Sequence, residues 1–187
     1  HARKRTPNVW WSQLIEDHGD SIDRATNEKN IGVVYQKRGE SGKARAYYRR
    51  SLEFSQGQGQ YIGDAITYGN IGSSLMDEGR VSEGLEGMQK ALELKQKYGA
   101  TPNSLTHTLF DLSKAYRLLG NNEQAKIYAE EVIAIGKANN NALAVQYGYK
   151  YLSEVNDAEG DYQKAYDNFR NIKEFKAQNK ANLSLYS

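Results

Sequence analysis

The chain has 187 residues, and its 25 basic and 23 acidic side chains give a formal net charge of +2. A chain so close to neutrality has no global field that favours nucleic acid or an anionic membrane, so no nucleic-acid binding is expected of this domain. It contains no cysteine, which excludes disulfides, thiol nucleophiles and cysteine-bound metal.

The first expected element is an N-terminal arm with a capping helix over residues 1–20. Pro7 stands where the first turn of a helix tolerates proline, because the missing N–H would be unpaired there in any case. The residues that follow, including Trp10, Trp11 and Leu14, supply an apolar side for this helix. We expect it to cover one end of the structure that follows.

Four glycines then recur through the chain at intervals of 40, 41 and 40 residues: Gly39, Gly79, Gly120 and Gly160. Five residues after each glycine stands a small residue: Ala44, Gly84, Ala125 and Ala165. Four residues further on come Tyr48, Met88, Ala129 and Phe169. A fixed period of this length indicates a repeat protein. The large residues of the last set are expected to fill the space between successive repeats.

Each repeat is predicted to be a pair of helices. Leu105, Leu109, Leu112 and Tyr116 follow at spacings of four, three and four, which is typical of an amphipathic helix. A glycine just past a helix adopts the left-handed conformation without strain, so the recurring glycine is expected to end the first helix of each pair. The next pair is expected to begin at an N-cap: Asp64, then Asn103 or Ser104, then Asn140 or Asn141.

The pattern Asn70-Ile71-Gly72-x-x-Leu75, followed by glycine, a small residue and a large one in four copies, resembles the tetratricopeptide repeat. The resemblance covers about residues 25–178, with a period near 40 rather than the usual 34 or so of that family. Departures are Gly84, where the family has alanine, and Asn156, where it has tyrosine. The resemblance implies an all-α fold, a right-handed α–α superhelix of four helical hairpins plus the N-terminal helix.

The same resemblance implies the domain organisation. The array occupies residues 21–187 after the arm of residues 1–20, and its repeats are expected at about 25–62, 63–102, 103–141 and 142–180. The stretch from Gly63 to Gly72 is similar to longer repeats that precede histidine kinase, diguanylate cyclase or DNA-binding domains in bacterial signalling proteins.

In this family the first helix of each pair lines a concave groove that binds partner segments. Carried over position by position, the resemblance predicts these groove residues: Lys29, Asn30, Gln36, Asn70, Asp77, His107, Asp111, Lys114, Arg117, Tyr147, Tyr151 and Glu154. Lys114 and Arg117 lie three apart on one helix face, so both can reach one carboxylate or phosphate. The alternative is that both pair with Glu154 and Asp157 on the next first helix.

Catalytic and metal-binding motifs are absent from the sequence. His1, His18 and His107 have no metal-binding spacing, and no nucleophile motif occurs. The chain is therefore predicted not to be an enzyme and to need no cofactor or metal. No run approaches the roughly 18 apolar residues of a membrane-spanning helix, so no membrane insertion is expected of this fragment. A bacterial cytoplasm and a periplasm are both compatible with these features.

The favoured function is a protein- or peptide-binding module, the sensory or scaffolding part of a larger bacterial signalling protein. The first alternative is a self-association or spacer module that forms a homodimer, because Ile172 and Phe175 on the last helix have no visible cover. The second is a regulator of the peptide-pheromone type, which requires a deeper groove than four repeats usually enclose.

Overall fold

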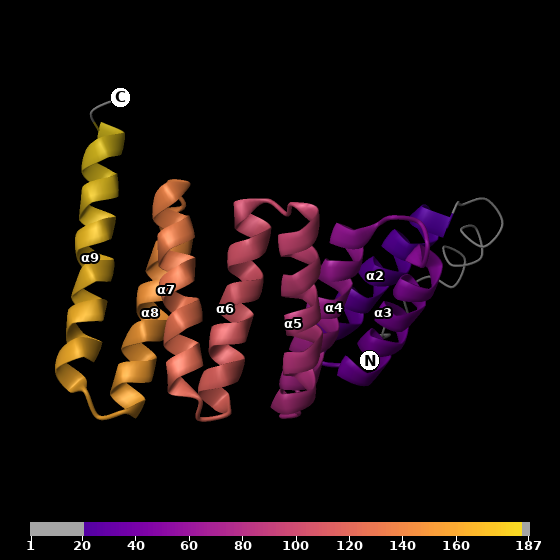
Figure 1. Cartoon of the computed structure of the whole chain (residues 1–187), viewed down its shortest axis with the longest axis horizontal. Coiled ribbons are helices and arrows are strands. Elements are labelled where there is room, and N and C mark those ends of the chain that lie inside the picture. Colours follow the sequence, from indigo (N-terminus) through magenta and orange to yellow (C-terminus); the bar gives the residue numbers. More distant parts are fainter. Residues whose placement is uncertain (1–20, 185–187) are drawn as a thin grey trace, which may run out of the picture. The chain divides into compact units, whose positions relative to one another are not determined.

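The computed structural model describes residues 21–184, with side chains described up to Phe175 and at Ala177. The expected capping helix with Trp10 and Trp11 lies outside the described residues. Over residues 21–184 the chain is helical and contains no strand. The helices (Figure 1) are α2 (Ser21–Lys37), α3 (Ser41–Ser55), α4 (Tyr61–Met76), α5 (Val81–Tyr98), α6 (Pro102–Leu118), α7 (Asn122–Ala138), α8 (Ala142–Ala158) and α9 (Tyr162–Ser184). The predicted all-α class and paired helices are confirmed.

The chain divides into two compact units, His1–Leu94 and Lys95–Ser187. In the first, here called the N-terminal unit, α3 packs against both α2 and α4. In the second, the C-terminal unit, α7 packs against α6 and α8, α8 packs against α9, and the first helices α6 and α8 also touch each other. The expected limits of the domains and of the individual repeats stay predictions.

The recurring glycine has the predicted role. Gly39, Gly79, Gly120 and Gly160 have φ angles of +75°, +78°, +76° and +78°. In each case the residue after the glycine donates its backbone N–H to a carbonyl five residues earlier, as Glu40 does to Tyr35 at 3.0 Å. This hydrogen bond closes the last turn of the first helix. The glycine therefore ends that helix and reverses the chain into the second one.

The small residue five positions later explains how closely paired helices approach. A Cβ built on Gly72 would lie 2.5 Å from the carbonyl oxygen of Gly84, and one built on Gly84 would lie 2.6 Å from that of Gly72. Two glycines thus face each other where α4 and α5 cross. The departure at Gly84 from the alanine of the family follows from this contact, because the crossing has no room for a methyl group.

The N-caps were predicted with mixed success. Asn141 caps α8, since its side chain accepts from the backbone N–H of Ala144 at 3.0 Å. The prediction of Asp64 is wrong: α4 already begins at Tyr61, and Asp64 instead accepts a hydrogen bond from the Ser55 hydroxyl. The prediction of Asn103 or Ser104 is also wrong, because the cap of α6 is Thr101.

At the start of α6, Thr101 is the cap and accepts from the backbone N–H of Ser104 at 3.3 Å. Pro102 is the first helical residue, a position where its missing N–H costs nothing. The side chain of Asn103 is thereby left free to take part in the site described below.

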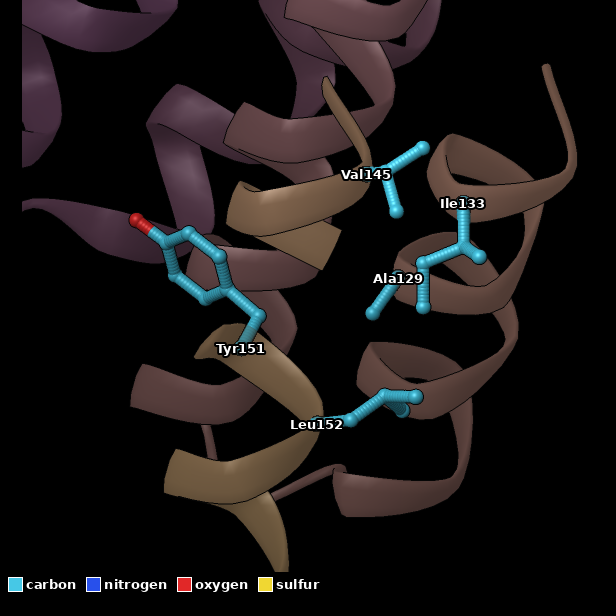
Figure 2. Close-up of a cluster of buried hydrophobic side chains, with 5 residues drawn as sticks. All are labelled: Ala129, Ile133, Val145, Tyr151 and Leu152. Carbon is cyan, nitrogen blue, oxygen red and sulfur yellow. The ribbon is translucent and has the colours of Figure 1, made fainter. Parts of the chain in front are cut away.

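The core lies between the paired helices. Tyr48 and Met88 are fully buried, as predicted for the large residue of each repeat. In the C-terminal unit, Figure 2 shows Ala129 and Ile133 of α7 facing Leu152 of α8.

The last helix departs from two expectations. Phe169 was expected to fill the space between repeats, but it is 50% exposed because no further described helix covers α9 on that side. Phe175 was expected to be uncovered, but its ring packs against the core cluster of α7 and α8.

Candidate functional site

The C-terminal unit contains an open pocket of about 390 Å³ between the N-terminal halves of α6 and α8. Val132 of α7 forms part of its floor, beside Phe110 and Ala144. The pocket is lined by Asn103, Thr106, His107, Phe110, Val132, Asn141, Leu143, Ala144 and Tyr147. A volume of this size, with an apolar floor and a few polar groups, is typical of a ligand site.

Three aromatic rings join α6 to α8 at this pocket. Phe110 meets Tyr147 edge to face with centroids 5.2 Å apart, and meets Tyr151 in the same way at 4.4 Å. Figure 2 shows the Tyr151 ring on the opposite side of α8 from Leu152 and the α7 residues. Burial raises the pKa of Tyr151 to about 12, and the carboxylate of Glu154 adds to the shift. Tyr147 is 45% exposed, so its ring is available to a ligand.

One ion pair on α6 borders the pocket. Nδ1 of His107 lies 3.3 Å from Oδ2 of Asp111, one turn away on the same helix. The hydrogen bond to Asp111 raises the pKa of His107 above its usual value, although desolvation and the cation of Lys95 oppose the shift. Both groups were predicted to face the groove, and here they are paired with each other.

Lys95 is a buried cation of the same unit. Its Nζ donates to the carbonyl oxygen of Ser104 and to the hydroxyl of Thr108, each at 2.7 Å. Burial lowers the pKa of this amine. Lys95 therefore holds the start of α6 in place rather than facing a ligand.

The ion pairs further along α6 and α8 show whether Lys114 and Arg117 pair with the acidic side chains of α8. Arg117 lies 3.3 Å from Oε2 of Glu154, and Lys150 lies 3.7 Å from Oε1 of the same carboxylate. Asp157 forms no ion pair with them. Lys114 is partly buried and has no ion-pair partner among the described residues. The alternative of pairing across the two helices thus applies to Arg117 and not to Lys114.

In the N-terminal unit, Gln36 and Asp77 belong to one polar network. Nε2 of Gln36 donates to the hydroxyl of Ser73 at 3.3 Å and to Oδ2 of Asp77 at 3.1 Å. Its Oε1 accepts from the hydroxyl of buried Tyr48 at 2.8 Å. Burial raises the pKa of Tyr48 to about 12, with a further contribution from Asp77. These groups join α2, α3 and α4, so Gln36 is engaged in holding the helices together rather than in offering polar atoms to a ligand.

The other predicted residues of this unit are less engaged. Lys29 is partly buried and lines a small pocket of about 30 Å³. Asn30 is exposed and Asn70 is partly buried. The structure therefore gathers the predicted residues into two sets, one in each unit.

Sequence reasoning missed several residues of the larger pocket. Nδ2 of Asn141 donates to Oδ1 of Asn103 at 2.7 Å across the pocket mouth. Leu143, directly after the first residue of α8, is 64% exposed at the rim. The only sequence feature that could have indicated this pocket was the apolar side chain of Leu143 near the start of a helix.

Among residues 21–175 no cluster of three or more His, Asp or Glu side chains can hold a metal ion. The helices within 21–184 include none that is long and apolar enough to cross a membrane.

These observations define an α-helical repeat protein built from paired antiparallel helices. The sequence profile of the tetratricopeptide repeat family matches residues 63–138, and a second profile of that family matches residues 30–57. The chain belongs to the tetratricopeptide repeat family. Because this family forms protein-interaction scaffolds, the chain is a repeat module of the protein-binding class. None of the curated proteins matches it in sequence.

Solved structures of the same fold include three informative relatives. A Rap protein complexed with competence and sporulation factor is 18% identical with a TM-score of 0.77, covering 93% of this chain and 48% of its own. Aspartyl phosphate phosphatase F from Bacillus subtilis is 15% identical with a TM-score of 0.80, covering 90% and 44%. The TPR domain of Arabidopsis FLU is 18% identical with a TM-score of 0.57, covering 63% and 98%. This chain thus spans about half the length of the first two.

Proposed function

We propose that the α6–α8 face of the C-terminal unit binds an extended segment of a partner protein or peptide. The observation that carries this proposal is the 390 Å³ pocket between two consecutive first helices. Exposed His107 and Tyr147 stand at its rim and Phe110 at its floor. An aromatic ring with a polar tip is a good anchor for a peptide. In this family the first helices line the concave groove, and the position of the pocket between two first helices supports the proposal.

The remaining predicted groove residues extend the same proposal. Lys114 offers a cation to an acidic partner. The pair of Arg117 and Glu154 is partly exposed, and since surface ion pairs contribute only about 0–1 kcal/mol, a partner can compete for either group. In the N-terminal unit, the polar atoms of Lys29, Asn30 and Asn70 are proposed to bind the partner.

The test is site-specific photo-crosslinking. A benzophenone amino acid replaces Tyr147, and the matched control carries it at Ile127, which is comparably exposed on α7. We expect position 147, and not 127, to cross-link reproducibly to one segment of a partner. A synthetic peptide of that segment should then bind the chain. Equal cross-linking at both positions, or a peptide that does not bind, would contradict the proposal.

We also propose that this module is the sensory or scaffolding part of a larger bacterial signalling protein. The similarity of Gly63–Gly72 to repeats that precede signalling domains supports it, as does the fold shared with the Rap protein. Reading the coding sequence on both sides of these residues tests it. An open reading frame without any kinase, cyclase, phosphatase or DNA-binding domain would contradict it.

A second candidate function is self-association through α9. Three aromatic residues at helical spacing lie on one face of this helix and are 70%, 62% and 50% exposed: Tyr162, Tyr166 and Phe169. The corresponding residues of the first repeat, at the interval that separates Gly39 from Gly160, are all buried: Ser41, Arg45 and Tyr48. The face is thus one that another helix covers elsewhere in the chain, and the α9 of a second copy can cover it here.

Light scattering over a concentration series tests this candidate. We expect a dimer that is lost in Tyr166→Ser and kept in Tyr61→Ser, a control at an exposed tyrosine of α4. A monomer at every concentration would contradict self-association.

A further inference from the structure

The larger and the smaller pocket described above occupy equivalent places in the repeat. Seven residues of the larger pocket follow seven residues of the smaller one by the same two-repeat interval that separates Gly39 from Gly120. The pairs are Ile22 and Asn103, Ala25 and Thr106, Thr26 and His107, Lys29 and Phe110, Ser51 and Val132, Gln60 and Asn141, and Gly63 and Ala144. The same site therefore exists once in each unit, and the two copies can be compared directly.

In the N-terminal unit the site is small and is lined mostly by residues with polar side chains. Its volume is about 30 Å³, room for about one or two water molecules. Lys29 and Ser51 line it, and the hydroxyl of Ser55 donates to Asp64 across one end. This copy has no room for a side chain of a partner.

In the C-terminal unit the site is apolar and open. Phe110 replaces Lys29 and Val132 replaces Ser51, while Leu143 and Tyr147 extend the rim, and the volume rises to about 390 Å³. Burial of a partner's apolar side chain in an apolar recess of this size is favourable.

Two polar groups on α6 can contact a peptide bound in this recess: Asn103 at its mouth and Lys114 further along the helix. At the mouth, Asn103 accepts from Asn141, which leaves the Nδ2 hydrogens of Asn103 available to a peptide carbonyl. Lys114 lies on the same face of α6 two turns beyond His107, about 10 Å along the axis. On the same two helices, Asp111 is paired with His107 and Glu154 with Arg117. A carboxylate of a partner is therefore the complement that Lys114 lacks.

We propose that the C-terminal pocket takes the bulky apolar side chain of an extended peptide whose carboxylate binds Lys114. An extended chain rises about 3.3 Å per residue, so the acidic group stands about three residues from the apolar one. This inference rests on the proposed function and names the class of peptide that the α6–α8 face selects. The N-terminal copy of the site, with Lys29 in place of Phe110, does not share this preference.

The experiment begins with selection of a phage-displayed library of random heptapeptides on the chain. Selected peptides are synthesised and their binding is measured by fluorescence polarisation. We expect a leucine- or phenylalanine-like residue two to four positions from an aspartate or glutamate. Replacing the apolar residue of the peptide by alanine should weaken binding at least tenfold. Leu143→Ser should weaken it at least threefold, whereas Ile127→Ser, at an exposed apolar residue outside the pocket, should not.

Lys114→Gln should weaken binding threefold to tenfold and reduce its dependence on salt, and Lys97→Gln, another lysine of the C-terminal unit, should change neither. The possible outcomes distinguish the two proposals. If no peptide that binds is recovered, the proposed function and this inference are both overturned. Peptides that bind the face without the apolar and acidic pair, or whose affinity is unchanged in Leu143→Ser and Lys114→Gln, overturn this inference alone.

Discussion

The rings of Phe110 and Tyr151 meet edge to face, with centroids 4.4 Å apart and planes at 80°. This contact joins the first helices of two consecutive repeats within the C-terminal unit. Because Phe110 also forms the floor of the pocket, the same ring supports both the packing of α6 on α8 and the shape of the site. Stability and the proposed binding are therefore expected to be coupled at this residue.

Phe110→Ala is predicted to lower the free energy of unfolding by about 2–4 kcal/mol, somewhat less than for a fully buried phenylalanine because Phe110 is only partly buried. Urea unfolding followed by circular dichroism measures the change. The control is Phe169→Ala, which removes the same ring from a half-exposed position on α9. That variant should lose about 1 kcal/mol or less, and an equal loss in both would show that the contact with Tyr151 contributes little.

The crossing of α4 and α5 provides a second prediction. Gly84→Ala places a methyl group 2.6 Å from the carbonyl oxygen of Gly72. A backbone carbonyl cannot move aside as a side chain can, so the free energy of unfolding should fall by about 1–3 kcal/mol. Gly42→Ala is the control, because a Cβ at this helical position meets nothing within 4 Å. Its effect should be neutral or a gain of up to about 1 kcal/mol, and thermal unfolding of the two variants distinguishes the cases.

Features that depend on neighbouring residues alone could be predicted from the sequence. The left-handed turn at Gly120 needs only a glycine after an amphipathic helix, and the paired helices follow from the same local pattern. The start of α4 could not be predicted in this way: Asp64 was expected to cap the helix, but its partner is Ser55 on the preceding helix. The carboxylate of Asp64 therefore accepts a tertiary hydrogen bond and does not accept one from the backbone N–H groups of its own helix.

The candidate site was predicted in part for a related reason. The family resemblance placed Tyr147 and Tyr151 in the groove; Tyr147 lines the pocket and Tyr151 packs against Phe110, and their role in binding stays a prediction. The volume of the pocket could not be predicted, since it depends on what packs between helices. Which acid Arg117 selects was also open, because Glu154 and Asp157 are both within reach of it by sequence spacing.

Tyr48 offers a test of the polar network in the N-terminal unit. Tyr48→Phe leaves Oε1 of Gln36 without its donor, which should cost about 1–2 kcal/mol at neutral pH. The pKa of Tyr48 is raised to about 12 in the folded chain, against about 10 when unfolded. The folded state thus favours the neutral phenol, and this stability is complete below about pH 10 and declines as the pH rises from there to about 12. The difference between wild type and Tyr48→Phe should therefore shrink between about pH 10 and about pH 12, and a constant difference would contradict the assignment.

The ion pair of His107 predicts how the stability of the chain changes with pH near neutrality. Its pKa is raised by the hydrogen bond to Asp111, so the folded state favours the imidazolium. The resulting stability is present below the unfolded pKa of about 6.5 and is lost as the pH rises through the higher folded value.

Nuclear magnetic resonance titration of the His107 ring measures this shift directly. The wild-type pKa should exceed about 6.5, and Asp111→Asn should lower it, because the amide removes both the charge and the acceptor geometry of the carboxylate while the cation of Lys95 remains. Lys114→Gln serves as the control, since Lys114 is not among the groups that shift His107. If Asp111→Asn left the titration unchanged, the pair would not exist in solution, and His107 would be free to bind the partner instead.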